Sequence, residues 1–338
     1  MARVSQGIIY RSKSVLTKGD GVVDRHPIRF GIQTAQQGVA WAEILDLWRH
    51  ADAWGYDSLW DFDHFYPIYA DPEGPCLEGW TTLSALAQAT TRVRIGHLVN
   101  GNTYRHPCVT AKMAATLDHI SGGRFNLGIG AGWFELEHRS FGIDFKTVGG
   151  RLAALDEACQ IICGMFTQPK TTFHGRHYTV TDAMCCPRPL QQPHPPIMIG
   201  GTGKKVLLKI VAKYADMWNA GGSAETLRGL IEIIQRHGDA VGRDTDAIEK
   251  TVMLSLCYKA APPRQESMCN RMANMSQTSP EQARRQMLIG DKQECLDTIE
   301  RYLQAGITHF ILMPSTPYHL DEIQAFADEV IPAVTSRR

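Results

Sequence analysis

The chain has 338 residues, which is enough for one large domain or two ordinary ones. Its 35 basic residues balance its 35 acidic residues, and neither half carries a strong block of one sign, which argues against nucleic acid as a partner and favours a small molecule. No apolar run reaches the roughly 18 residues that a membrane helix needs, and the N-terminal segment lacks the apolar region of a secretory signal, so we expect a cytoplasmic protein that does not enter a membrane.

The first part of the chain and its cysteines bound the organisation further. Residues 1–26 predict a weakly ordered N-terminal extension, and residues 27–338 predict one domain. Nine cysteines, scattered without CxxC or finger spacing, favour reduced thiols over a disulfide framework. The pairs Cys159 with Cys163 and Cys185 with Cys186 could touch a metal, but we interpret them as structural thiols and predict no metal site.

From Ile28 onward, short apolar or β-branched runs alternate with amphipathic helical stretches, a pattern typical of βα units in a parallel sheet. The predicted strands are residues 28–33, 57–62, 93–99, 124–130, 196–201, 216–220, 250–258 and 307–313. The predicted helices between them include residues 41–55, 79–91, 106–121 and 151–166. Eight βα repeats indicate the α/β class and a TIM (β/α)8 barrel with insertions.

Two segments exceed what a simple barrel requires. Residues 167–195 contain TFHGRHYTV, which predicts a small hairpin, followed by a proline-rich stretch that cannot form a ladder. Residues 259–280 are rich in turn and polar residues, and we predict a lid-like loop over the carboxyl mouth of the barrel, the alternative being a flexible connection.

The second predicted strand ends in LWDFDHFYP, where acidic and imidazole groups follow an apolar run. Functional side chains of a TIM barrel project from the carboxyl ends of the strands, so this position favours a functional role for Asp63 and His64 over a structural one. Asp61 still lies within the strand, and we predict that it is a structural hydrogen-bond acceptor.

Glycines follow two later strands. Gly200 and Gly201, with Thr202 and the start of the next helix, suit a phosphate, although many βα turns need glycine for steric reasons alone. LGIGAGWFELEH has alternating glycines that leave a smooth floor on which a flat ring could lie, unless they serve tight helix packing. Near the third strand, Asn100 and Asn102 offer amide groups for the polar edge of a heteroaromatic ring.

Several longer motifs add a resemblance to these clusters. LEGWTTLSALAQATTRVRIG, AATLDHISGGRFNLGIGAGWFELEHRSFGI, RLAALDEACQII and PHPPIMIGGTG, followed by ADMWN, resemble the bacterial luciferase-like monooxygenase superfamily over residues 28–315. Within it, they look like the oxidoreductases that depend on coenzyme F420, a deazaflavin. The resemblance implies a TIM barrel with a helical insertion before the eighth strand and a homodimer, since members are commonly dimers.

The resemblance also implies roles for single residues. Asp63 and His64 would flank the reactive ring, and Leu98 and Val99 would form a bulge with a cis peptide bond, next to Asn100. Further cofactor contacts are implied for Gly132 and Glu137 along the ribityl chain and for Ile199, Gly200, Gly201 and Thr202 at the phosphate. Glu78, at the start of a helix, would face the pocket.

These assignments predict an F420-dependent oxidoreductase that transfers a hydride between the cofactor and a small organic substrate. His64 is the expected proton partner, because an imidazole ordinarily exchanges a proton near neutral pH, and Glu78 is the second catalytic candidate. Sugar-phosphate dehydrogenases of the superfamily have a tryptophan and a glutamate where this chain has Ile68 and Trp133. We therefore expect an apolar or aromatic substrate.

Two other functions stay open. The first keeps the fold and uses FMN as a monooxygenase with reduced flavin and oxygen. The second is a non-catalytic flavin-binding or deazaflavin-binding protein, against which the intact Asp63, His64 and Glu78 argue. A metal hydrolase is disfavoured, because the chain has no HxH on its first strand and ELEH is not HExxH.

Overall fold

The computed structural model describes residues 26–68 and 70–336. Eight strands form a ring: β1 (Arg29–Gln33), β2 (Ser58–Asp61), β3 (Arg94–His97), β5 (Phe125–Gly130), β8 (Ile197–Gly200), β9 (Met217–Ala220), β10 (Glu249–Tyr258) and β12 (His309–Pro314). Each pairs in parallel with the next, and β12 pairs with β1, so the ring closes. The predicted TIM barrel is confirmed, and each of its strands overlaps a predicted one. The predicted extension, residues 1–26, lies outside the described residues except for His26.

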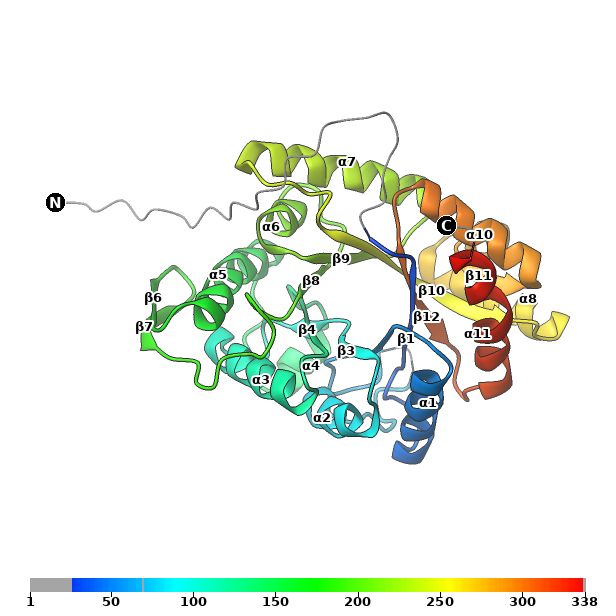
Figure 1. Ribbon diagram of the computed structural model, residues 1–338, viewed down its shortest axis with the longest axis horizontal. Helices are drawn as coiled ribbons and strands as arrows, with labels where there is room; N and C mark the ends of the chain where they lie inside the picture. The colour runs from blue at the N-terminus through cyan, green and yellow to red at the C-terminus, as the bar shows by residue number, and fades with distance from the viewer. Residues whose placement is uncertain (1–25, 69, 337–338) are drawn as a thin grey trace.

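Helices surround the ring of strands (Figure 1). They are α1 (Trp41–Ala53), α2 (Gly79–Ala89), α3 (Pro107–Ile120), α5 (Val148–Thr167), α6 (Leu207–Tyr214), α7 (Ala224–Val241), α10 (Lys292–Gln304) and α11 (Leu320–Thr335). The short helix α4 (Glu135–Ser140) follows β5. Among the helices of the described residues, none combines the length and the apolar character needed to cross a bilayer.

The strands separate two apolar cores. Leu59 and Trp60 are neighbours in β2 and are both fully buried, yet they belong to different clusters, because successive side chains of a strand point to opposite faces. Leu59 packs in the large core between the strands and the helices. Trp60 belongs to a small cluster with Met198, Met217 and Ile311, which come from strands around the ring and fill its interior. The alternation of side chains along each strand thus supplies residues to both apolar cores.

A polar layer closes the amino end of the barrel. Arg29 donates to Glu249 at 2.9 Å, and His309 Nδ1 lies 3.3 Å from the same carboxylate. Ser58 Oγ is 2.8 Å from His309 Nε2. Burial raises the pKa of Glu249, but His309 and Arg29 outweigh burial and lower it to about 2. Since these residues begin their strands, the ion pair stabilises the end of the barrel opposite the predicted site.

The hairpin predicted within residues 167–195 is present. Strands β6 (Thr171–His174) and β7 (Thr179–Ala183) pair in antiparallel fashion beside α5 (Figure 1). The proline-rich stretch between β7 and β8 contains no strand among the described residues, as expected.

The prediction of a lid-like loop over residues 259–280 is wrong. The chain instead forms the helix α8 (Pro262–Ser276), then the short helix α9 (Pro280–Arg284) and a strand β11 (Met287–Gly290), which pairs with β10 outside the closed ring. The composition of this segment is polar, but Pro262 and Pro263 occupy the first turn of α8 and Pro280 that of α9, where proline is tolerated. The buried side chains of α8 include Met268 and Cys269, which share a separate apolar cluster with Met287 of β11. Packing of α8 on β11 thus outweighs the weak intrinsic helix preference of this polar segment. The observed helix agrees with the helical insertion that the resemblance implied.

Candidate active site at the carboxyl end of the barrel

A cavity of about 410 Å³ lies at the carboxyl ends of the barrel strands. Its lining comes from the ends of β1, β2, β3, β5, β8 and β9 and from β10. The predicted site residues that line it are Asp63, His64, Leu98, Val99, Asn100, Gly132, Gly200 and Gly201. The predicted residues that do not line it are Glu78, Glu137, Ile199 and Thr202. The parallel strands therefore gather residues from distant parts of the sequence at one mouth, as the fold requires.

His64 stands at the rim of this cavity and is held from behind. It is 8% exposed, and its Nδ1 lies 2.8 Å from Oε2 of Glu137, which α4 carries 73 residues later in the chain. A carboxylate accepts hydrogen bonds only, so this contact assigns the proton to Nδ1. Within the described residues, Nε2 has no hydrogen-bond partner. The Glu137 contact thus fixes the ring and leaves the other nitrogen available to a ligand.

The carboxylate of Glu137 accepts hydrogen bonds from four donors, and the side chain is fully buried. Besides His64, it accepts from the backbone N–H of Phe65 at 2.6 Å, from that of Tyr66 at 2.9 Å and from the hydroxyl of Tyr104. Burial raises the pKa of Glu137, but the hydrogen bonds from His64 and Tyr104 outweigh burial and hold the pKa below its usual range. Its carboxylate therefore positions His64, whereas the resemblance implied a contact with the ribityl chain.

Asp63 and Glu78 share one cation. Arg105 Nη1 donates to Asp63 Oδ2 at 2.7 Å, and Arg105 Nη2 donates to Glu78 Oε1 at 3.0 Å. Glu78 also caps the start of α2 by accepting from the backbone N–H of Trp80 and Thr81. Burial raises the pKa of Glu78, but the contacts with Thr81, Trp80 and Arg105 outweigh burial, so its pKa lies below the usual range. Glu78 therefore lacks the raised pKa that would suit a proton donor.

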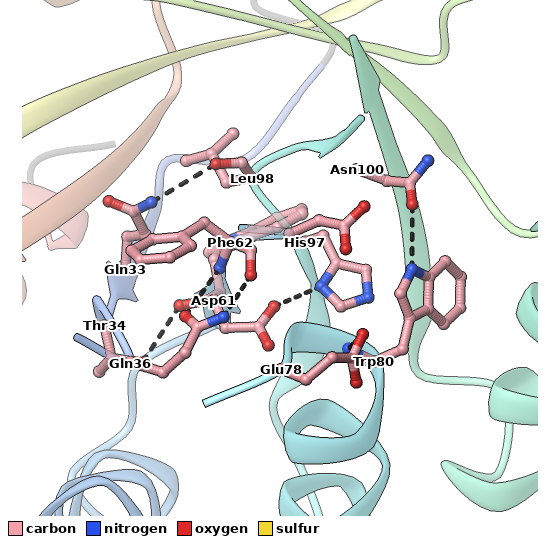
Figure 2. A network of polar contacts seen from close by, with 12 residues as sticks. Gln33, Thr34, Gln36, Asp61, Phe62, Glu78, Trp80, His97, Leu98 and Asn100 are labelled. Carbon is pink, nitrogen blue, oxygen red and sulfur yellow. Dashed lines mark hydrogen bonds and ion pairs between the residues drawn. The ribbon is translucent and has the colours of Figure 1, made fainter. Parts of the chain in front are cut away.

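Asp61 acts as the predicted structural acceptor. It is fully buried at the end of β2 and accepts from His97 Nδ1 at 2.5 Å, and Figure 2 shows the carboxylate directed at the imidazole. Burial raises the pKa of Asp61 to about 6, although His97 opposes this rise. Burial lowers the pKa of His97, but Asp61 outweighs burial and raises it. The pair joins β2 to β3 below the cavity.

The turn after β3 contains a cis peptide bond between Leu98 and Val99, as the resemblance implied. Gln33 Nε2 donates to the carbonyl of Leu98 at 3.4 Å, and Trp80 Nε1 donates to Asn100 Oδ1 at 2.9 Å (Figure 2). These contacts come from β1 and from α2. They fix the backbone that separates β3 from β4 (Asn100–Gly101) and keep Val99 and Asn100 at the cavity wall.

Glycines form much of that wall. The cavity is lined by Gly101, Gly130, Gly132, Gly200, Gly201 and Gly221. A Cβ on Gly130 would lie 2.8 Å from Val99 Cγ2, and a Cβ on Gly200 would lie 3.2 Å from Val99 Cγ1. The absence of side chains at Gly130 and Gly200 lets Val99 pack closely against the wall. The smooth floor for a flat ring, inferred from the alternating glycines, stays a prediction.

Two polar atoms beside this floor have no partner within the described residues. Asp63 Oδ1 is a buried acceptor, and Asn100 Nδ2 is a buried donor. Both residues line the cavity. A buried polar atom without a partner costs free energy, about 1–3 kcal/mol, unless a ligand or water satisfies it. An unpartnered acceptor and an unpartnered donor are the types of group that the edge of a pyrimidinedione ring, in which an N–H group adjoins a carbonyl group, would engage.

The turn after β8 is open and basic. The backbone of Gly201 is held in place, because its N–H donates to Asn219 O and its carbonyl accepts from Trp218 Nε1, each at 2.9 Å. Thr202 is exposed, and so are the next charged residues, Lys204 and Lys205. α6 begins at Leu207 without a side-chain cap. This turn can contact an anion, whereas Ile199 packs wholly into the helix-facing core and offers only its backbone.

Several residues that line the cavity were not predicted from the sequence. Tyr104, Gln33 and Asn219 line the cavity, and Met253 reaches it from β10. Gln33 and Asn219 lie at the ends of predicted strands, so their positions carried a signal. Tyr104 lies in the turn after the third strand, but its contact with Glu137 depends on where α4 lies, which no local pattern states.

Comparisons with known proteins give the context of this geometry. A family model described as luciferase-like monooxygenase matches residues 25–268. The F420-dependent glucose-6-phosphate dehydrogenase of Kineococcus radiotolerans is 27% identical and covers 92% of this chain and 99% of that protein. The protein of the same name from Amycolatopsis mediterranei is 25% identical and covers 90% of this chain and 98% of that protein. The FMNH(2)-dependent dimethylsulfone monooxygenase of Pseudomonas putida is 27% identical but covers 60% of each chain.

Solved structures show the same fold. An F420-dependent secondary alcohol dehydrogenase, in complex with an F420-acetone adduct, aligns with a TM-score of 0.80 at 22% identity and covers 91% of this chain and 99% of that chain. The F420-dependent tetrahydromethanopterin reductase of Methanopyrus kandleri aligns with a TM-score of 0.76 at 20% identity and covers the same shares. At such low identity, these likenesses establish the architecture of the barrel.

Proposed function

Because this chain belongs to the luciferase-like monooxygenase family, we propose that it is an F420-dependent oxidoreductase that transfers a hydride between a deazaflavin and a small organic substrate. The family predicted from the sequence motifs is confirmed by the match. The relatives named as F420-dependent align over nearly their whole length, whereas the relative named for FMNH(2) aligns over 60% of its own. This contrast supports the deazaflavin over FMN.

The observation that carries the proposal is the pair of unpartnered atoms beside the glycine wall. Asp63 Oδ1 and Asn100 Nδ2 are buried, and both residues line the cavity. They would accept from and donate to the pyrimidinedione edge of the ring, while the wall around Val99 would support its face. The donor and acceptor set thus fits the group, and the exposed Thr202, Lys204 and Lys205 suit its anionic tail.

When bound, the deazaflavin would supply two-electron hydride chemistry. The chain supplies the remaining parts of the reaction. For an alcohol substrate, loss of a hydride from carbon is matched by loss of the hydroxyl proton, and His64 Nε2 would take that proton. Glu137 keeps Nδ1–H oriented, so the free nitrogen presents a lone pair toward the cavity. Glu78 would hold Arg105 and the start of α2, a positioning role in place of the predicted catalytic one.

An equilibrium titration with each cofactor tests the proposal. Purified protein is titrated with oxidised F420 and with FMN, and binding is followed by fluorescence quenching. We expect tighter binding of F420, and the F420-loaded protein should consume no oxygen above the rate of free cofactor. Preferential binding of FMN, with oxygen consumption after reduction, would instead establish the FMN-dependent monooxygenase. A protein that binds F420 but turns over no substrate would be the non-catalytic alternative, against which the His64–Glu137 contact argues.

Two further properties are proposed from weaker support. A homodimer is expected from the resemblance to a family whose members are commonly dimers, and sedimentation of the purified protein tests it. A cytoplasmic location agrees with nine cysteines that are all free thiols in the structure. Microscopy of a tagged chain would test the location.

A further inference from the structure

We propose that the substrate is an uncharged molecule with a flat apolar or aromatic group that packs on Trp133, and that the site selects against sugar phosphates. This inference rests on the proposed function and names its substrate class. It departs from the curated relatives, whose names specify glucose 6-phosphate. Three features of the cavity support it: its charge, its apolar surface and the way Trp133 is held.

The charge of the cavity disfavours a phosphate. The described residues that line it include no lysine or arginine, whereas Asp63 contributes a buried carboxylate. Arg105 lies behind Asp63 but is already paired with that carboxylate and with Glu78. A phosphate dianion next to an acidic residue, without a cation, would lose its hydration without compensation. The described lining of the cavity therefore offers a phosphate no free cation as a partner, which disfavours such a substrate.

The wall around His64 is apolar and aromatic. Phe62, Ile68, Trp133 and Met253 line the cavity. Trp133 is 57% exposed although it lines a cavity, which is unusual for so large an apolar side chain. A ligand that covers the indole would remove this apolar surface from water, which favours binding.

Trp133 is held as a fixed surface. Its ring centroid lies 5.2 Å from that of Phe134 at an interplanar angle of 31°, and 5.7 Å from that of His64 at 68°. The contact with Phe134 is tilted, and the contact with His64 has the edge-to-face arrangement that aromatic pairs prefer. A flat group on the indole would therefore lie beside the imidazole that we assign as proton partner. Trp133 is in this way a specificity residue, placed by the glycine-rich turn after β5.

Calorimetric titrations of F420-loaded protein test the inference directly. The probes are acetophenone, which is uncharged and aromatic, and glucose 6-phosphate. We expect acetophenone to bind about tenfold more tightly or better, because a difference of 1.4 kcal/mol already gives this ratio. Equal or tighter binding of glucose 6-phosphate would overturn the inference. The cofactor titration is made first, so that a failure of F420 binding counts against the proposed function and is distinguishable from a reversed ligand preference.

Variants of Trp133 separate the packing from the fold. Trp133→Ala is expected to weaken acetophenone binding about tenfold, since both the aromatic contact and the apolar area that it buries are lost, while F420 affinity changes by less than about twofold. Trp133→Phe should retain most of the affinity. Trp41→Ala is the matched control, because Trp41 is 39% exposed on α1 and does not line the cavity. Unchanged acetophenone affinity in Trp133→Ala would overturn the inference.

A gain of function gives a second test. Ile68 is half-buried and lines the cavity. Ile68→Lys supplies the missing cation, so glucose 6-phosphate should bind several-fold more tightly than to the parent protein, while acetophenone binds more weakly. An unchanged preference in this variant would show that charge is not what excludes the phosphate, and would contradict the inference.

Discussion

His64 Nδ1 lies 2.8 Å from Glu137 Oε2, and both side chains are buried at the mouth of the barrel. The carboxylate also holds the backbone N–H groups of Phe65 and Tyr66, so it fixes both the imidazole and the segment that carries it. This arrangement orients one nitrogen and frees the other, as in other acid–base sites where a carboxylate sets the tautomer of a histidine.

His64→Ala removes the proposed proton partner and leaves the glycine wall of the cavity intact. We expect turnover to fall by about 10²- to 10⁴-fold, which is the usual contribution of a positioned acid or base. The dissociation constant of F420 should change by less than about threefold, because the glycine wall, Asp63 and Asn100 remain. Steady-state kinetics and cofactor titration on the same sample give both values. Unchanged turnover would remove His64 from the mechanism.

Glu137→Gln keeps the size of the side chain but removes its charge and one acceptor position. The amide cannot accept from all four donors, so His64 loses its fixed orientation. Turnover should fall about tenfold or more, yet less than in His64→Ala, and KM should change little. Glu135→Gln on the same helix is exposed and serves as the control. If both variants behaved alike, the positioning role of Glu137 would be excluded.

The Arg105 cation holds two carboxylates, one of them fully buried. Arg105→Met leaves Asp63 buried without its partner, and breaking such a pair from one side costs about 3–5 kcal/mol. We therefore expect the free energy of unfolding, measured by denaturant titration, to fall by this amount. Arg139→Met at an exposed position of α4 should change stability by less than about 0.5 kcal/mol. A loss in Arg105→Met no greater than in this control would contradict the pairing.

The polar layer at the amino end of the barrel predicts that the free energy of unfolding falls in acid. The pKa of Glu249 falls from its usual 4.5 to about 2 in the fold, so its carboxylate stabilises the protein above pH 4.5, and the contribution is lost as the pH falls toward 2. A shift of this size corresponds to roughly 3 kcal/mol. Glu249→Gln should lose this stability at pH 7, and its difference from the parent protein should vanish near pH 2. Urea titrations between these values check it, with the exposed Glu232→Gln as control.

The barrel could be predicted because its strands carry their own signal. Each strand of the ring is a short apolar run bounded by glycine, proline or polar residues, so its position follows from local pattern. The segment after β10 carried no such signal. α8 is polar along most of its length, and β11 has only four residues, and each is stabilised by the other through Met268 and Met287. This mutual dependence cannot be deduced from either segment alone.

The candidate site also has a part that could be predicted from the sequence and a part that could not. Asp63, His64 and Asn100 were identified because they follow predicted strands, and in a barrel such positions converge. The partners of these residues come from elsewhere: Arg105 reaches Asp63, and Glu137 reaches His64 across 73 residues. These contacts depend on the positions that the turn after β3 and the helix α4 take in the folded chain. The sequence therefore indicates the candidate site residues, and the structure indicates which residues hold them.

Cofactor titration of a variant with a filled cavity tests the central claim most directly. Gly221 lines the cavity, and a Cβ there would meet no atom within 4 Å, so Gly221→Phe adds a bulky ring at the cavity wall without a clash at its Cβ. The account predicts that the parent protein binds F420 more tightly than FMN and that Gly221→Phe, with an unchanged melting temperature, loses F420 affinity by about tenfold or more. Tighter binding of FMN by the parent protein, or undiminished F420 affinity in this variant, would contradict it.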